Sequence, residues 1–325
     1  MMVTNELPNK ALTRNKLVYR KANTVIKDLK ENGVFFIMLL PSALLTIMLC
    51  YIPMFGIIIA FKEYNFRDGM FGSKWSGLKN FEFFFKSGKA WLITRNTLLY
   101  NLVFIITGTI IAIMLAIFIS EVGGKYYKKI AQSAVFLPNF MSWVIISTIA
   151  YNIFNPDYGT LNTLRKFIGL SSIDVYSKSA YWYFILPILN IWKAAGWGSI
   201  IYFAAIMGID QECYEAGEID GANIFQKTWH ITLPMLKPTV TILTLLSIGG
   251  ILRGNFDMFY QLIGNNGILF NSTDIIDTYV FRSLLNNQDI GMSAAAGLYQ
   301  SMFGFILIWG VNRIIRKISP EYALF

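Results

Sequence analysis

A short acidic stretch interrupts an otherwise apolar chain, and it brings the carboxylates of Glu212, Glu215, Glu218 and Asp220 close together between two long apolar segments. Carboxylates at this spacing could take part in acid–base chemistry at a membrane face, or could form a charged surface that another protein contacts. Acid–base or metal chemistry would need partners that are missing here. His230 is the only histidine, and no Asp-x-Asp pair accompanies the stretch. The sequence therefore predicts no catalytic residue and no metal site.

A second group of candidate residues lies inside apolar segments, where polar side chains are costly and often functional. Flat aromatic faces and hydrogen-bonding side chains together hold sugars, and the segment 181–208 offers both. The candidates for a substrate pathway are Asn190, Trp192, Lys193 and Trp197, with Asn139, Trp143, Tyr299 and Gln300 as weaker ones. The alternative is that the tryptophans are packing residues and that Lys193 pairs with a backbone carbonyl or a neighbouring subunit. A pore-facing Lys193 would favour an acidic sugar.

The composition places these residues in a membrane protein. Of 325 residues, 55% are hydrophobic and only 14% are charged, whereas a soluble domain has about 25% charged residues. The formal net charge is +9, which could indicate nucleic-acid binding. The basic residues, however, concentrate around the apolar segments, as is typical of membrane orientation signals. We therefore expect a lipid bilayer as the surroundings and no nucleic acid as a partner.

Six apolar segments are long enough, or nearly so, to cross a bilayer as helices. They cover residues 33–61, 92–119, 130–154, 181–208, 234–252 and 291–315. Pro41 and Pro53 could kink the first of them. The predicted fold class is all-α: a polytopic membrane protein with six transmembrane helices, separated by polar segments of which 62–90 and 253–290 are the longest.

The orientation follows from the basic flanks. The total numbers of basic residues on the two sides are similar, so the short loops and the first flank decide. The tail 1–32 is basic, as are the short loop 123–129 and the end of the last span. We expect the tail to be cytosolic and to precede an uncleaved first span, because it is too long and too charged for a signal peptide. Both termini and the acidic stretch are then cytosolic.

Two further features have alternative interpretations. The first outer loop is rich in aromatic residues, which either anchor a short amphipathic helix at the lipid headgroups or dock an external partner. These residues are Phe66, Phe71, Trp75, Phe81, Phe83, Phe84 and Phe85. Cys50 lies in an apolar span and Cys213 in the acidic stretch, so we expect no disulfide between them.

The acidic stretch itself is predicted to form two short helices. Asp210 can cap a helix that begins at Gln211, where acidic side chains suit the helix dipole. Gly221 interrupts the run, and the apolar and acidic residues do not separate onto two faces of a single helix. Two helices that meet near Gly221 therefore fit the sequence better than one.

Residues of this stretch resemble the EAA motif of ABC importer permeases. The motif reads Glu-Ala-Ala, three residues, Gly, nine residues, Ile, one residue and Leu-Pro. The matching residues are Glu215, Ala216, Gly217, Gly221, Ile231, Leu233 and Pro234, with Gly217 where the family usually has alanine. Further stretches are similar to oligosaccharide permeases, including the alginate and pectin-fragment importers. They are 62–85, 274–285, 319–325 and the group Trp192, Lys193, Gly196, Trp197 and Gly198.

The resemblance implies a type I ABC importer permease (MetI-like) fold in a bacterial cell membrane. Its domains would be a cytosolic tail 1–32, a first helix and extracellular loop 33–91, a five-helix permease domain 92–312 and a cytosolic tail 313–325. A coupling loop at about 210–233 would contact an ATPase through Glu215, Ala216, Gly217, Asp220, Gly221 and Ala222. The implied partners are a second homologous permease, two ATPase subunits, an extracellular solute-binding protein and an oligosaccharide.

The motor is expected on another chain. A P-loop needs G-x-x-x-x-G-K-[ST], and the nearest fragment, Gly123-Gly124-Lys125-Tyr126, lacks the first glycine and the hydroxyl. ATP and Mg²⁺ would therefore bind to the partner ATPase, and this chain would carry no cofactor. The alternatives to the permease are a multi-pass membrane enzyme that acts on polysaccharide and a secondary sugar carrier that needs no ATPase.

Overall fold

The computed structural model describes residues 32–86, 88–286 and 288–318, and the chain divides into two units at Ile58. The first unit contains α2 (Gly33–Thr46), the π-helical turn η1 (Ile47–Tyr51) and the beginning of η2 (Ile52–Phe61), a 3₁₀ helix. Pro41 lies inside α2, and no residue of α2 is buried. The segment Gly33–Phe61 is long and apolar enough to cross a membrane, as predicted.

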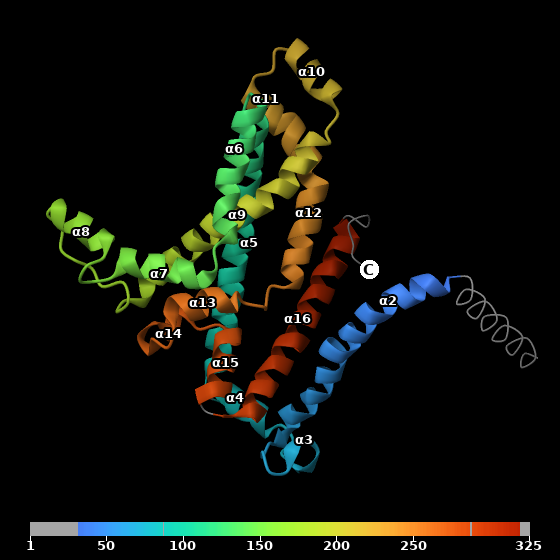
Figure 1. Ribbon diagram of the computed structural model, residues 1–325, viewed down its shortest axis with the longest axis vertical. Helices are drawn as coiled ribbons and strands as arrows, with labels where there is room; N and C mark the ends of the chain where they lie inside the picture. The colour runs from blue at the N-terminus through green and yellow to red at the C-terminus, as the bar shows by residue number, and fades with distance from the viewer. Residues whose placement is uncertain (1–31, 87, 287, 319–325) are drawn as a thin grey trace, which may run out of the picture. The chain divides into compact units, whose positions relative to one another are not determined.

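Apart from one small hairpin, the secondary-structure elements in the described residues of the second unit are helices. Its other four candidate spans are Lys89–Glu121 (α5), Ser179–Met207 (η4, Ser179–Tyr181, and α9, Trp182–Met207), Ile224–Gly249 and Ile290–Lys317, which lies within α16 (Ile290–Ile318). Figure 1 shows α5 and α9 crossing in the middle of the unit, with α12 (Leu233–Gly249) beside them. Five of the six predicted spans are therefore present as helices of sufficient length in the described part of the chain.

The predicted third span, 130–154, is not one straight helix. It consists of α6 (Lys125–Phe136) with η3 (Leu137–Phe140), followed after a break by α7 (Trp143–Phe154), and the two parts are bent by 92°. The hydropathy of the segment predicted its membrane character but not its break. Met141 has an extended backbone and so does Ser142, whose hydroxyl caps α7 by accepting from Ile145 N at 3.4 Å.

The predicted fifth span also differs. The sequence placed its beginning near Pro234, whereas the helix begins at Ile224 and continues through α11 (Ile224–Lys227), the π-helical turn η5 (Thr228–Thr232) and α12. A capping box explains the earlier start: Asn223 Oδ1 accepts from Gln226 N at 2.9 Å, and Gln226 Oε1 accepts from Asn223 N at 2.8 Å. Such a box satisfies two of the backbone donors that a helix start leaves unpaired.

Close packing of small side chains joins the two central helices. Ala112 and Ala116 of α5 are buried against Tyr202, Ile206 and Leu236. A methyl group at Gly198 of α9 would lie 3.2 Å from Cβ of Ala112. Small residues at helix crossings let backbones approach closely, which is how membrane helices associate without a hydrophobic driving force.

The segment 253–290 is not merely a polar connection. It forms α13 (Phe256–Ile263), η6 (Gly267–Leu269), α14 (Phe270–Thr273) and α15 (Ile276–Asn286). Met258, Phe259, Ile275 and Ile276 are buried in it. The first three pack with Trp182, Leu186 and other residues in the largest core cluster. The sequence analysis took this segment for a polar connection, but it contributes buried apolar residues to the core.

The loop 62–90 carries the small hairpin, whose strands β1 (Lys62–Glu63) and β2 (Lys74–Trp75) flank α3 (Gly69–Gly72) and pair Lys62 with Trp75. The amphipathic helix α4 (Lys79–Lys86) follows. Phe84 is fully buried, with its ring 6.0 Å from Tyr279 and 5.5 Å from Tyr299. This residue anchors α4 to the protein core rather than to lipid headgroups.

Candidate functional site

The acidic stretch folds as α10 (Gln211–Ile219) followed by α11. Figure 1 shows it at the end of the unit where α9 ends and where α6 and α12 begin. Asp210 caps α10, because its Oδ1 accepts from Glu212 N at 3.1 Å. The cap and the break near Gly221 were predicted from the sequence and are confirmed, whereas the second helix is not short, because α11 continues into α12.

Gly221 makes the turn between the two helices possible. Its φ is +75°, and it is preceded by Asp220 in right-handed conformation. Ala222 N donates to Gly217 O at 2.9 Å, and Gly221 N donates to Glu218 O at 3.0 Å. These two bonds form a Schellman motif, which ends a helix with a left-handed residue that is usually glycine. The turn is therefore held by backbone geometry.

Side chains then tie the two helices together. Lys227 Nζ lies 2.8 Å from Glu218 Oε1, and Tyr214 Oη lies 3.0 Å from Thr232 Oγ1. A methyl group at Gly217 would lie 3.2 Å from Cδ1 of Ile231. The glycine that replaces the family's usual alanine thus sits under the end of a flexible side chain.

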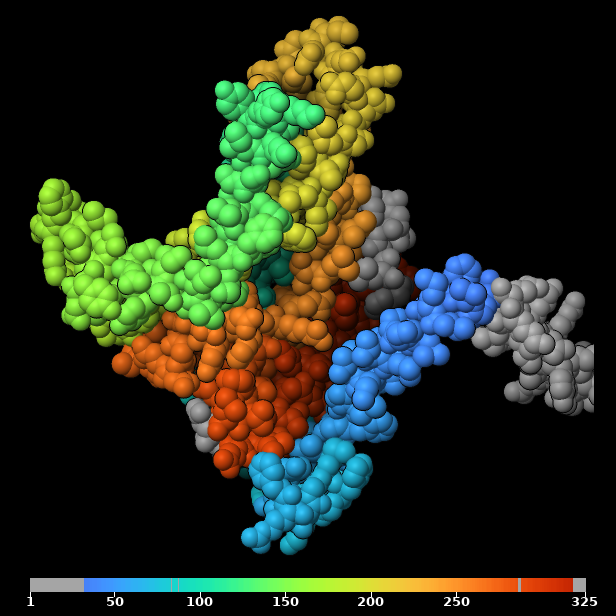
Figure 2. All heavy atoms as spheres, viewed as in Figure 1, coloured from blue at the N-terminus to red at the C-terminus, as the bar shows by residue number. Residues whose placement is uncertain are grey.

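The six predicted coupling residues lie on this folded segment and most are accessible. Glu215, Ala216, Asp220 and Gly221 are exposed, whereas Gly217 and Ala222 are half-buried. Figure 2 shows the segment projecting beyond the ends of the helices that carry it. The arrangement presents two acidic side chains and a backbone turn to an incoming surface.

Sequence reasoning missed three apolar residues of the same surface. The exposed fractions are 87% for Ile219, 85% for Phe225 and 70% for Trp229. Their signal was present in the sequence, since they are large apolar side chains in a stretch outside the apolar segments proposed to cross the membrane. Exposed apolar patches mark protein or membrane interaction sites, and Phe225 and Trp229 lie at the beginning of the candidate span Ile224–Gly249.

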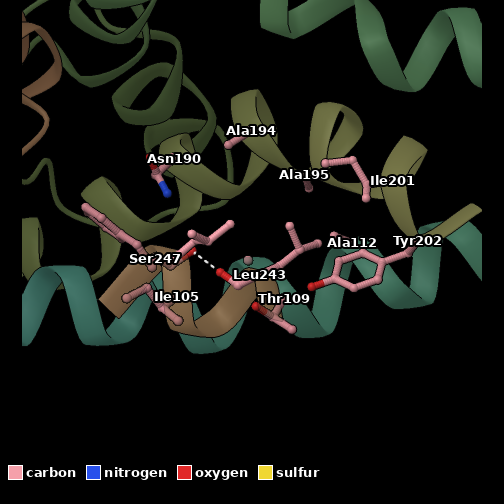
Figure 3. Close-up of a pocket in the computed structure, with 14 residues that line it drawn as sticks. Ile105, Thr109, Ala112, Asn190, Ala194, Ala195, Ile201, Tyr202, Leu243 and Ser247 are labelled. Carbon is pink, nitrogen blue, oxygen red and sulfur yellow. Dashed lines mark hydrogen bonds between the residues drawn. The ribbon is translucent and has the colours of Figure 1, made fainter. Parts of the chain in front are cut away.

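The eight predicted pathway residues do not gather at one place. Only Asn190 lines the cavity of about 480 Å³ between α5, α9 and α12. Figure 3 shows its side chain directed into that space, which Thr109, Tyr202 and Ser247 also line. None of the fourteen described residues lining the cavity is charged. The cavity offers apolar walls with a few hydroxyl and amide groups.

Three of the remaining pathway residues meet at the break of the third span. Lys193 Nζ donates to Asn139 O at 2.8 Å and to Met141 O at 2.5 Å, and it lies 5.6 Å from the ring centroid of Trp143. Trp197 stacks on Phe136 with centroids 5.5 Å apart, and Trp192 is partly exposed nearby along α9. The alternative in which Lys193 pairs with backbone carbonyls is the one that the geometry shows.

Tyr299 and Gln300 lie at a third location, in the N-terminal half of α16. Tyr299 Oη lies 3.1 Å from Thr94 Oγ1. Gln300 Nε2 donates to Leu252 O at 2.6 Å and approaches Asp277 Oδ1 at 3.2 Å. Asp277 Oδ2 in turn accepts from Gly254 N at 2.7 Å. These contacts join the end of α12 to α15 and α16.

Most of the chain is similar to known membrane transport proteins. Residues 108–320 match the model of the family described as binding-protein-dependent transport system inner membrane component. The chain is 34% identical to Protein LplB of Bacillus subtilis, over 90% of this chain and 92% of the relative. It is also 34% identical to the polygalacturonan/rhamnogalacturonan transport system permease protein YteP of the same organism, over 93% of each chain.

Solved structures give the same picture. A chain of a bacterial ABC transporter involved in the import of the acidic polysaccharide alginate superposes with a TM-score of 0.82 at 31% identity. The match covers 91% of this chain and 99% of that one. A second structure, of a bacterial alginate ABC transporter in complex with an alginate pentasaccharide-bound periplasmic protein, gives a TM-score of 0.81.

Proposed function

Because this chain belongs to the family of binding-protein-dependent transport system inner membrane components, we propose that it is the transmembrane permease subunit of an ATP-driven oligosaccharide importer. The observation that carries the proposal is the likeness to an alginate importer chain over nearly the whole length of both. The predicted MetI-like permease fold is confirmed by this likeness. The chain itself is then a non-catalytic subunit of the cell membrane.

The folded segment 210–233 is proposed to dock on an ATPase subunit, with Glu215, Ala216, Gly217, Asp220, Gly221 and Ala222 at the contact. Its support is the combination of exposure and rigidity. Caps and a Schellman turn fix the backbone, so little conformational entropy is lost on binding. The exposed side chains of Ile219, Phe225 and Trp229 would supply apolar area, and aromatic anchors of this kind dominate binding energy at interfaces.

The helices on either side of the segment make it suitable for transmitting force. α9 ends at Met207, only a few residues before α10, and α11 continues without a break into α12. A displacement of the docked segment would therefore move two spans that line the cavity. ATP and Mg²⁺ on two ATPase subunits would drive this displacement, which requires that the contacts differ between the two states.

The proposed substrate is an oligosaccharide delivered by an extracellular solute-binding protein. The support is that a relative matched over 93% of the chain, YteP, is named as a polygalacturonan/rhamnogalacturonan transport system permease protein. The cavity with Asn190 is proposed as part of the pathway, because it combines apolar walls for sugar C–H surfaces with amide and hydroxyl groups. Trp192, Trp197, Tyr299 and Gln300 remain pathway candidates that a second, homologous permease subunit would have to complete.

The orientation is part of the same proposal. Both termini and the segment 210–233 would be cytosolic, so that the ATPases act from the side where ATP is present. The loop 62–90 and the segment 253–290 would then face the solute-binding protein. The basic residues Arg316 and Lys317 in the last turn of α16 fit this orientation.

The deciding experiment compares three variants of the reconstituted transporter. Glu215→Lys and Gly221→Asp are expected to abolish oligosaccharide uptake while the protein stays in the membrane. The matched control is Glu212→Lys, an exposed acidic residue of the same helix outside the motif. Co-purification of the ATPase is measured with each. Unchanged uptake in both motif variants, or uptake by the chain without any ATPase, would contradict the proposal.

A further inference from the structure

The break in the third span leaves backbone groups that need partners. A helix end has four carbonyl groups without intrahelical donors, and η3 ends at Phe140, two residues before α7 is capped. In a bilayer an unsatisfied backbone group is costly, so broken helices occur only where protein groups, or water in a cavity, supply partners. The side chain that supplies them here comes from another span.

That side chain is Lys193 of α9. Its ammonium group donates to the carbonyl oxygens of Asn139 and Met141, on either side of the end of η3. The same group lies over the ring of Trp143, the first residue of α7. A cation at a helix C-terminus is favoured by the helix dipole, and a cation above an indole ring adds attraction. One side chain thus contacts both arms of the bend.

Two neighbours on α9 fix the same region independently. A methyl group at Gly196 would lie only 2.1 Å from Val135 O, so the backbones of α9 and α6 are in direct contact. Trp197, one residue further, stacks on Phe136 at an interplanar angle of 25°. The stretch 193–197 of α9 therefore contacts the last turn of α6, the end of η3 and the start of α7.

We infer that Lys193 is a positioning residue of the transport cycle, which clamps the bent third span to α9 so that both move as one body. This inference rests on the proposed function, in which α9 is displaced by the segment 210–233. Trp143 packs against the large core cluster that contains Trp182 and Met258. The clamp therefore passes movement of α9 to α7 and to the helices on that side of the unit.

The inference gives Lys193 a role other than sugar binding. Two of its three ammonium protons are engaged by carbonyl groups of this chain. It is also absent from the lining of the cavity that contains Asn190. A substrate carboxylate would have to displace backbone bonds in order to pair with it.

The test measures the bend itself. Nitroxide labels at Tyr127→Cys in α6 and Ile149→Cys in α7 report the distance between the two arms, in a background where Cys50 and Cys213 are replaced by serine. Double electron–electron resonance is recorded on the full transporter in nanodiscs, with the wild-type residue at position 193 and with Lys193→Met and Lys193→Arg. Uptake and binding-protein-stimulated ATP hydrolysis are measured on the unlabelled versions.

We expect Lys193→Met to shift or broaden the distance distribution. Because this variant loses hydrogen bonds from a charged group, the equilibrium constant between the clamped and the unclamped state should fall roughly ten- to a hundredfold. Uptake should fall about tenfold or more, while the ATPase stays attached and hydrolyses ATP. Lys193→Arg should keep both the distance and uptake near the wild-type values, since arginine keeps a cation with several hydrogen-bond donors at this position. Gly196→Ala should also shift the distance, because its methyl group would push the backbone of α6 away from α9.

Two results would overturn the inference. One is an unchanged distance distribution in Lys193→Met. The other is a raised KM for an acidic oligosaccharide with unchanged distances, which would make Lys193 a substrate ligand. The distance measurement does not depend on which solute is transported. Loss of the clamp is therefore distinguishable from failure of the proposed function, which Glu215→Lys and Gly221→Asp test through ATPase attachment.

Discussion

Replacing Gly221 by alanine should weaken the proposed contact with the ATPase by backbone strain alone. The residue has φ +75°, and a methyl group there would meet no atom within 4 Å. No clash contributes, so the cost is that of a left-handed conformation for an L-residue, about 1–2 kcal/mol. If docking needs the Schellman turn, the equilibrium constant between the correct turn and other conformations of the segment falls by a factor of roughly 5 to 30.

Two further substitutions make the reasoning specific. Gly221→Asn should cost less than Gly221→Ala, because asparagine tolerates the left-handed region better than other side chains. Gly217→Ala should be mild, although it fills space 3.2 Å from Ile231 Cδ1, because the end of that side chain can move. The expected order of ATPase affinity is therefore wild type and Gly217→Ala first, then Gly221→Asn, then Gly221→Ala.

The assay is the affinity of the purified ATPase for the permease pair in nanodiscs, with hydrogen exchange of residues 216–222 as a measure of the turn. Gly221→Ala should raise Kd and speed exchange of the Ala222 amide, which donates to Gly217 O. An affinity equal to that of the wild type, or a Gly221→Asn variant that binds worse than Gly221→Ala, would refute the argument from φ.

Two other predictions concern the surface and the core. Phe225→Ala should lower ATPase affinity without changing the thermal unfolding of the isolated permease, because the side chain is largely exposed; a lowered Tm would show that it supports the fold instead. Asp274→Asn should lower the thermal stability of the subunit in detergent, because Asp274 is buried and its Oδ2 lies 2.5 Å from Arg282, whose guanidinium also covers the ring of Phe270. Removing one partner of such a pair costs about 3–5 kcal/mol, and an unchanged Tm would contradict this.

Local rules explain what the sequence predicted correctly. The composition and the apolar runs predicted an all-helical membrane protein and the approximate positions of its spans. Asp210 and Gly221 predicted a capped helix and a second helix after a turn, because caps and left-handed turns depend on neighbouring residues only. The capping box of Asn223 and Gln226 was an equally local signal, and overlooking it placed the start of the fifth span too late.

The remaining features depended on contacts between distant segments. A side chain that faces lipid and one that faces another helix are both apolar, so hydropathy locates a span without giving its direction or its breaks. At the 92° bend, Lys193 of α9 donates to backbone carbonyls of residues 139 and 141, and Gly196 lets α9 approach the backbone of residue 135. The eight pathway candidates separated for the same reason: the sequence determined which polar side chains lie within or beside spans, and only the packing of the helices decided what each of them contacts.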